Sequence, residues 1–206
     1  MPVSVNIRKI RKFAASPISA EDRSIFQSDI TTILSIGRFA PQKDFITLIE
    51  AFALLHAKKP STRLCIIGDG PDKEKIVDCI KHHNLEKHVH LLGWKQNVYP
   101  YIKVCDIFAL SSNYEGFPYV LLEAAALGKP IVATDTPYGP RELLGNNVYG
   151  RIVPMKSPEA LYHALRLLLE VKAYARYQSQ IQTRTYQYSE AGMIRRYLSL
   201  VDGLHS

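Results

Sequence analysis

The sequence predicts an α/β fold, a Rossmann-like three-layer α/β/α sandwich with a parallel sheet between two layers of helices. Short apolar runs alternate with segments of helical periodicity through the middle of the chain, and this alternation is typical of parallel sheets. The runs are continuously apolar, as expected for strands that are buried on both faces. A chain of 206 residues with 47% apolar composition is long enough to bury such a core.

Six apolar runs are the predicted strands, and each is followed by a glycine or a polar loop. β-Branched and aliphatic residues dominate these runs, which favours the extended conformation. The predicted strands are 31–36, 63–67, 88–92, 105–110, 130–134 and 151–153.

The segments between the strands have helical periodicity. In residues 42–58, apolar side chains recur three or four positions apart, and Pro60 ends the helix. Residues 118–127 are apolar all round except for Glu123, so we expect this helix to be buried, with Gly128 as its C-terminal cap. The other predicted helices are 72–83, 97–103, 158–173 and 189–201.

The chain divides into three segments. Residues 1–30 are the least periodic, and we interpret them as a linker or wrapping segment. Residues 31–173 form the predicted α/β domain, and residues 174–206 form C-terminal helices.

The composition argues against several classes of protein. Three widely spaced cysteines without a CxxC pair disfavour a disulfide scaffold or a structural zinc site and fit a reducing cytoplasm. Neither a secretory signal nor a membrane-spanning apolar stretch is evident. Residues 1–30 hold five Lys/Arg and three Asp/Glu, and residues 171–206 hold five and two, so most of the net charge of +7 lies in the flanks. No block of Lys/Arg is present, and we expect no nucleic-acid partner.

The carboxyl ends of the predicted strands should share one edge of the sheet, where ligands bind in open α/β folds. Glycines stand at three of these ends and permit close approach of backbone N–H groups to a phosphate. These ends hold Gly37, Gly68 with Gly70, and Gly93 with Trp94. Short turns that need glycine without any ligand are the alternative.

Two cations, Arg38 and Lys43, lie at the same edge. Lys43 opens the helix predicted over 42–58, where the helix dipole repels a positive charge. A bound diphosphate would reverse this penalty, whereas an exposed surface loop would make both residues unremarkable.

Other cofactor motifs are absent or incomplete. The segment Gly68-Asp-Gly-Pro-Asp-Lys73 has a lysine where a dinucleotide-binding fingerprint needs a small residue, which argues against a nicotinamide-dependent dehydrogenase. A Walker phosphate loop is not found. Four histidines lie within residues 82–90, but no pattern of cysteines or acidic residues supports a metal site.

The sharpest local signal is the pair of acids in Glu115-Gly-Phe-Pro-Tyr-Val-Leu-Leu-Glu123. Pro118 suits the first turn of the helix that follows. Glu123 lies on that buried helix, and an ionised carboxylate is costly there unless a protein donor or a ligand hydroxyl partners it. A buried salt bridge is the alternative for Glu123, and an exposed loop position is the alternative for Glu115.

Eight motifs follow one another in a characteristic order and spacing over about residues 33–169. They are Ser35-Ile-Gly-Arg38 with Lys43, Ile67-Gly-Asp-Gly-Pro71, Leu92-Gly93, Asp106, Ser111, Glu115-x7-Glu123, Gly128-Lys-Pro130 and Gly139-Pro-Arg-Glu142. Together they resemble the C-terminal, donor-binding domain of retaining glycosyltransferases of family 4, which have the two-domain GT-B architecture.

The resemblance implies a role for each matching residue. Arg38 and Lys43 would bind the donor diphosphate without a metal or other cofactor, and Glu115 would position the donor sugar or stabilise charge. These three are the expected catalytic residues, and Glu123 would bind the ribose hydroxyls. The remaining expected donor-binding residues are Gly37, Gly68, Gly70, Gly93, Trp94, Gly116, Phe117 and Pro118.

The resemblance also implies the reaction, which is retaining transfer of a hexose-type sugar from a nucleoside diphosphate to a sugar or lipid-linked acceptor. UDP is the first candidate for the nucleotide and GDP the second. Surface polysaccharide or lipopolysaccharide synthesis is the expected pathway, at the inner face of the cytoplasmic membrane if the acceptor is a lipid. Alternatives are a nucleotide-sugar epimerase of the same fold and a non-catalytic nucleotide-sugar-binding module.

Whole enzymes of this family carry an N-terminal acceptor domain, which we do not find ahead of residue 31. We therefore expect the chain alone to bind donor without transferring sugar. The helix over 189–201 should then lack a docking surface, so that its apolar stripe is exposed or drives self-association.

Overall fold

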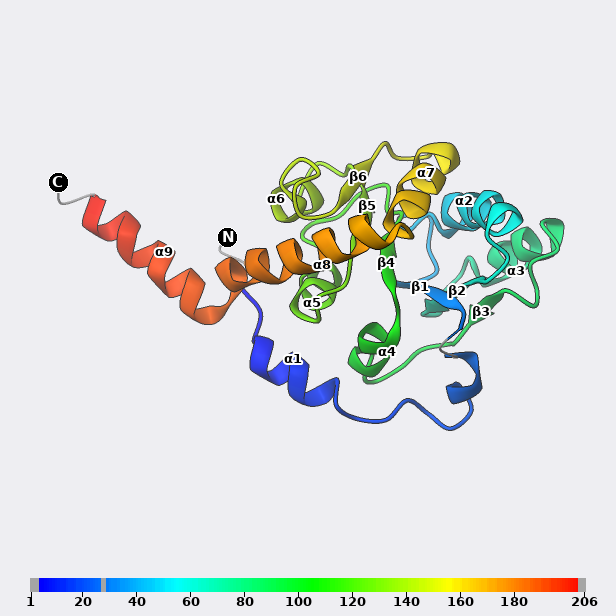
Figure 1. Cartoon of the computed structure of the whole chain (residues 1–206), viewed down its shortest axis with the longest axis horizontal. Helices are drawn as coiled ribbons and strands as arrows, with labels where there is room; N and C mark the ends of the chain where they lie inside the picture. Colours follow the sequence, from blue (N-terminus) through cyan, green and yellow to red (C-terminus); the bar gives the residue numbers. More distant parts are fainter. Residues whose placement is uncertain (1–3, 27–28, 204–206) are drawn as a thin grey trace.

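The computed structural model describes residues 4–26 and 29–203, and it confirms the predicted α/β class. One parallel sheet has the strand order β3-β2-β1-β4-β5-β6 (Figure 1). The strands are β1 (Thr31–Ile36), β2 (Thr62–Ile67), β3 (Val89–Leu91), β4 (Ile107–Leu110), β5 (Ile131–Thr134) and β6 (Arg151–Val153). The strand order reverses direction between β1 and β4, and a ligand crevice forms outside the carboxyl ends of the strands at such a point.

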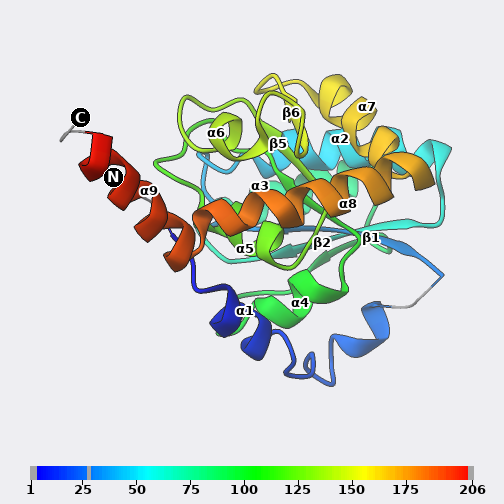
Figure 2. The same ribbon diagram turned by 60° about the vertical axis from the view of Figure 1, so that its left-hand side comes forward.

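Helices cover both faces of the sheet, which gives the three expected layers (Figure 2). Helices α2, α3 and α7 pack on one face, and α1, α4 and α5 pack on the other. The α-helices are α1 (Ile7–Phe13), α2 (Phe45–Lys58), α3 (Lys73–His82), α4 (Tyr99–Val104), α5 (Tyr119–Ala126), α6 (Pro140–Leu144), α7 (Pro158–Leu168), α8 (Val171–Thr185) and α9 (Glu190–Gly203). Two short 3-10 helices are η1 (Arg23–Ile25) and η2 (Tyr186–Tyr188).

The loops after β1 and β2 continue the pairing of the two strands. The N–H of Gly37 donates to the carbonyl of Ile67 (3.0 Å), and the N–H of Phe39 donates to the carbonyl of Asp69 (2.9 Å). A Cβ atom on Gly68 would lie 1.9 Å from the carbonyl oxygen of Gly37, and one on Gly70 would lie 2.4 Å from that of Phe39. Both glycines are therefore required by backbone contact between the loops, whether or not a ligand binds.

Two predicted helices differ from the structure by more than two residues at one end. The helix expected over 42–58 begins at Phe45, because Asp44 adopts the left-handed conformation and its carboxylate accepts from the N–H of Thr47 (3.3 Å). The single helix expected over 158–173 is two helices. The chain becomes extended at Glu170, so that α7 packs on α2 and α8 runs back across α5.

The described part of the N-terminal segment, residues 4–26, contains a helix that we did not predict. Helix α1 is capped by Asn6, whose side chain accepts from the N–H of Lys9 (2.8 Å), and it buries only Ile10. Asp22 then ties the segment to the body, since its Oδ2 lies 2.6 Å from both the hydroxyl of Tyr101 and the Nζ of Lys95.

Helix α9 extends away from the rest of the molecule (Figure 1). Ile194, Tyr197 and Leu198 are 56%, 66% and 54% exposed, so this part of the predicted apolar stripe is exposed as expected. Val201 of the same stripe lies outside the described side chains. Among the described residues, no helix combines the length and apolarity needed to cross a bilayer.

The packing of the two loops makes a prediction about stability. Gly68→Ala should lower the free energy of unfolding by about 1–3 kcal/mol or more, because the new Cβ meets the Gly37 carbonyl and the backbone φ is +154°. Gly116→Ala is the matched control, since a Cβ there meets no atom within 4 Å, and its effect should be within about 0.5 kcal/mol. Urea unfolding followed by circular dichroism measures both, and equal stabilities would contradict the prediction.

Candidate functional site

The carboxyl ends of β1 and β4, at the switch point of the sheet, bring together two of the predicted site residues. The Nζ of Lys43 lies 2.6 Å from Oε1 of Glu115, and their side chains are 17% and 7% exposed. The pair corrects the expectation that Lys43 opens a helix against its dipole: α2 begins two residues later, at Phe45, and Glu115 supplies the opposite charge. The low exposure also excludes the alternative of an exposed loop acid at Glu115.

The backbone around Lys43 is held by the loop that follows β4. The hydroxyl of Ser111 donates to the carbonyl of Lys43 (2.7 Å), and the N–H of Asn113 donates to the carbonyl of Gln42 (2.8 Å). The aliphatic stem of Lys43 crosses Gly37, where an added Cβ would lie only 3.0 Å from its Cδ. Gly37 thus gives the lysine stem room to reach Glu115.

Two buried hydroxyls complete the network around Glu115. Ser112 donates from Oγ to the same Oε1 that Lys43 contacts, at 2.6 Å. Thr134 donates from Oγ1 to the carbonyl of Ser112 at 2.5 Å, and both residues are fully buried. Sequence reasoning did not assign a role to either one. The sequence did carry a signal that could have pointed to them: Ser111 and Ser112 directly follow β4, and Thr134 ends β5.

Glu123 has a protein partner, as its buried helix required. The hydroxyl of Tyr99, on α4, donates to Oε1 of Glu123 at 3.0 Å. Burial raises the pKa of Glu123 above its ordinary value, and the hydrogen bond from Tyr99 partly offsets this effect. Burial and the nearby Glu123 raise the pKa of Tyr99 to about 12, so the phenol stays protonated and remains a donor. Tyr99 was not identified from the sequence.

The other predicted site residues line the same edge without joining this network. Arg38 is exposed, and within residues 4–26 and 29–203 its guanidinium has no hydrogen bond or ion pair. Trp94 is 73% exposed, beside Gly93, whose φ is +69°.

The segment from Gly116 to Pro118 approaches two other parts of the chain. The ring of half-buried Phe117 lies 6.4 Å from that of Tyr188. Pro118 is the N-cap of α5 rather than part of its first turn. It packs against Gly139, where an added Cβ would lie 2.3 Å from the proline Cδ. This geometry places the predicted donor-binding residues along one edge, and their roles stay predictions.

Potential metal ligands do not gather in the part of the chain that the structure describes, where no group of three or more His, Cys, Asp or Glu side chains could hold an ion. His88 instead stacks against His56, with ring centroids 3.9 Å apart.

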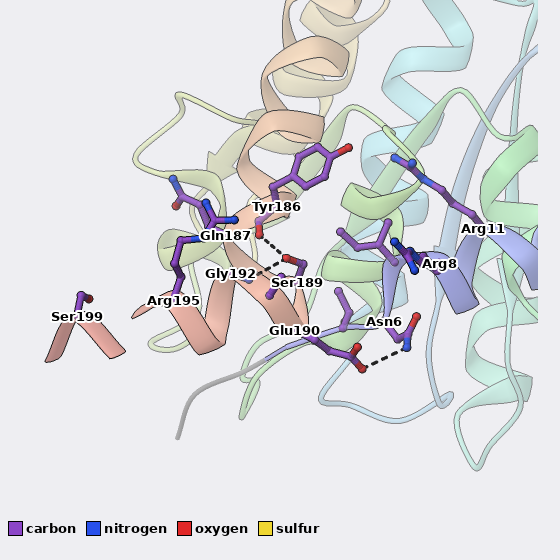
Figure 3. Close-up of a pocket in the computed structure, with 13 residues that line it drawn as sticks. Asn6, Arg8, Arg11, Tyr186, Gln187, Ser189, Glu190, Gly192, Arg195 and Ser199 are labelled. Atoms are coloured by element: carbon purple, nitrogen blue, oxygen red, sulfur yellow. Dashed lines mark hydrogen bonds between the residues drawn. The ribbon is translucent and has the colours of Figure 1, made fainter. Parts of the chain in front are cut away.

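A hollow lies between α1 and α9 (Figure 3), and none of the predicted site residues lines it. It is an open groove of about 1300 Å³. Arg8 and Arg11 line it from α1, and Arg195 lines it from α9. Asn6 and Glu190 bridge its two sides through a hydrogen bond of 3.2 Å.

Comparison with known proteins gives consistent results. A family profile described as "Glycosyl transferases group 1" matches residues 20–187. The chain is 32% identical, over 97% of its length, to the N-acetylgalactosamine-N,N'-diacetylbacillosaminyl-diphospho-undecaprenol 4-alpha-N-acetylgalactosaminyltransferase of Campylobacter jejuni. It is 30% identical, over 79% of its length, to the lipopolysaccharide core biosynthesis glycosyltransferase LpsE of Rhizobium meliloti. The chain spans 52% and 47% of the lengths of these two relatives.

Solved structures show the same fold. HepE of Anabaena, crystallised with UDP and glucose, superposes with a TM-score of 0.81 at 22% identity, over 97% of this chain and 55% of HepE. The C-terminal domain of the group 1 protein LpcC from Francisella tularensis has a TM-score of 0.76 at 22% identity, over 91% of this chain and all of that one. The chain therefore has the fold of such a C-terminal domain.

The environment of Glu123 predicts a pH-dependent contribution to stability. Because its pKa is raised in the folded state, the folded protein binds this proton more tightly than the unfolded chain. The stability contributed by Glu123 therefore falls as the pH rises above 4.5, its ordinary pKa. The gain in free energy of unfolding from Glu123→Gln should be larger at pH 8 than at pH 5, by on the order of 1 kcal/mol.

The control for this prediction is Glu86→Gln, at an exposed glutamate in the turn before β3. Its effect on urea unfolding should be the same at both pH values. An equal effect of Glu123→Gln at pH 5 and pH 8 would contradict the raised pKa.

Proposed function

Because the chain belongs to the glycosyl transferases group 1 family, we propose that it is the donor-binding half of a retaining GT-B glycosyltransferase. The enzyme would take a hexose-type sugar from a nucleoside diphosphate, and UDP is the first candidate for that nucleotide. The observation that carries the proposal is the placement of Lys43 and Glu115 at the switch point between β1 and β4. Arg38 adds an exposed cation at the end of β1. Two cations beside an acid at this edge suit a diphosphate next to a sugar.

Arg38 and Lys43 would bind the diphosphate and neutralise the charge that builds on it as the sugar departs. Preorganised cations contribute most where charge develops in the transition state. These side chains would supply the charge compensation that other transferases obtain from a metal ion, so we expect no metal requirement.

The two acids would serve different parts of the donor. The carboxylate of Glu123 accepts one hydrogen bond from Tyr99 and retains capacity for ribose hydroxyls, since a carboxylate has about four acceptor positions. Glu115 would orient the sugar or stabilise its developing charge. Transfer on one face of the sugar, with the leaving phosphate helping to deprotonate the acceptor, would retain the anomeric configuration.

The names of similar proteins support UDP and a polysaccharide pathway. HepE was crystallised with UDP and glucose, and the pneumococcal transferase GtfA with UDP and GlcNAc. The Campylobacter relative is named for a diphospho-undecaprenol-linked acceptor, and LpsE is named for the lipopolysaccharide core. We therefore infer a sugar or lipid-linked acceptor, and synthesis of a surface polysaccharide at the inner face of the cytoplasmic membrane.

The acceptor would be bound by a second domain of the kind that accounts for the remaining length of the relatives. The groove between α1 and α9 and the exposed side chains of Ile194, Tyr197 and Leu198 would face that domain. The chain alone would bind donor and transfer sugar poorly, because one wall of the active-site crevice would be missing.

Calorimetric titration with UDP, GDP and ADP tests the donor site. One nucleotide should bind, and Arg38→Ala and Glu123→Ala should each weaken its affinity roughly tenfold or more, the size of a hydrogen bond to a charged group. Arg38 is exposed, so its removal should leave the fold intact. EDTA should leave the affinity unchanged.

Lys81→Ala, at an exposed lysine on α3, is the control and should bind like the wild type. Absence of binding by a folded wild-type chain, or equal affinities for wild type and Arg38→Ala, would contradict the proposed donor site.

A further inference from the structure

We propose that Glu115 is an internal counter-ion that the donor diphosphate displaces from Lys43, and that Ser112 is the positioning residue that holds Glu115 during this exchange. The inference rests on the proposed function, because it requires a diphosphate at Lys43. It adds a competition between two anions for one ammonium group, together with a role for a serine outside the predicted site.

The pair of Lys43 and Glu115 is close and shielded from water. The two charged atoms are 2.6 Å apart, and the side chains are 17% and 7% exposed. Charges interact more strongly in such an environment than in bulk water. A diphosphate that enters the crevice therefore meets the attraction of the lysine and the repulsion of the glutamate together. The negative charge of Glu115 should oppose nucleotide binding, even though the residue belongs to the site.

Movement of Lys43 can be confined to its side chain. The hydroxyl of Ser111 holds the carbonyl of Lys43 at 2.7 Å, and the N–H of Asn113 holds the neighbouring residue Gln42. The lysine stem lies over Gly37, which has no side chain to block rotation. The ammonium group has three donor positions, so it can turn from the carboxylate toward a phosphate while the loop stays fixed.

Ser112 ensures that the carboxylate of Glu115 keeps one hydrogen-bond partner when Lys43 turns away. Its Oγ donates to the same Oε1 that Lys43 contacts, at 2.6 Å. A carboxylate that is almost fully buried would otherwise pay the cost of an unsatisfied charge. Thr134 fixes Ser112 in turn through a hydrogen bond of 2.5 Å to its carbonyl. After the nucleotide leaves, Glu115 lies ready to recover Lys43, which favours release of the product nucleotide.

The test is titration of the full chain with UDP, comparing wild type with Glu115→Gln. This substitution keeps the shape of the side chain and removes its charge. It should tighten UDP binding roughly tenfold, within the range of about 5–150-fold that is typical of coupled sites. A merely structural role for Glu115 predicts weaker binding or none, so the direction of the change is decisive. Glu86→Gln removes one negative charge elsewhere and should leave the affinity unchanged.

A double-mutant cycle tests Ser112. Ser112→Ala should weaken UDP binding several-fold in the wild-type background, because the carboxylate loses its remaining partner when Lys43 turns. In the Glu115→Gln background the same change should have almost no effect. Equal effects in the two backgrounds would overturn the positioning role.

The outcomes separate this inference from the proposed function. If wild type binds UDP, and Arg38→Ala weakens binding, but Glu115→Gln leaves it unchanged or weaker, the exchange is wrong and the donor site stands. If folded wild type binds none of UDP, GDP and ADP, the donor site itself fails. Should Glu115→Gln not fold, the side-chain carboxyl ¹³C resonance of Glu115 in wild type gives a direct measurement. It should shift during UDP titration, and an unchanged resonance would overturn the exchange.

Discussion

Strand β1 pairs with strands from both halves of the sheet, and the positions of the remaining elements follow from this double pairing. It is in register with β2 from Thr31↔Thr62 to Ile36↔Ile67, and it also pairs with β4 through Ile33 and Leu34. Since β2 and β4 lie on opposite sides of β1 and run parallel to it, the loops at their carboxyl ends flank the loop that follows β1. One side of that loop is closed by backbone contact with Gly68 and Gly70, and the other side carries the polar network of Lys43, Ser112 and Glu115.

This network contributes more to geometry than to stability. Desolvation of a buried ion pair offsets much of its Coulomb attraction, so Lys43 and Glu115 need not make the fold more stable. What they provide is a lysine whose ammonium group is held beside Glu115, at the carboxyl edge of the sheet, until a ligand arrives. The surrounding hydroxyls of Ser111, Ser112 and Thr134 act on backbone and carboxylate atoms and so fix both partners of the pair.

The sequence was most informative about features that depend on continuous runs of residues. All six strands were predicted within two residues at each end, because strands buried on both faces are visible as apolar runs. Helix α1 was missed because it buries only Ile10, and the break between α7 and α8 has neither proline nor glycine to mark it.

Lys43 and Glu115 could be placed at one edge of the sheet from the sequence, but their contact spans 72 positions and could not be predicted. Tyr99 and Ser112 were not identified, because a single hydroxyl becomes informative only when its spatial neighbour is known. Gly68 and Gly70 fit either a ligand or a tight turn in the sequence, and contact between the two loops is sufficient to require them.

The exposure of Trp94 has an optical consequence. It is the only tryptophan in the chain, and it is 73% exposed to solvent in the loop that follows β3. Its fluorescence in the folded protein should already resemble that of a hydrated indole, so emission will change little when the chain unfolds. A ligand or a second domain that covers this edge would instead move the indole into a less polar environment and shift its emission. The tryptophan fluorescence of this protein is therefore a local indicator of whether the loop after β3 is covered, and a poor indicator of folding.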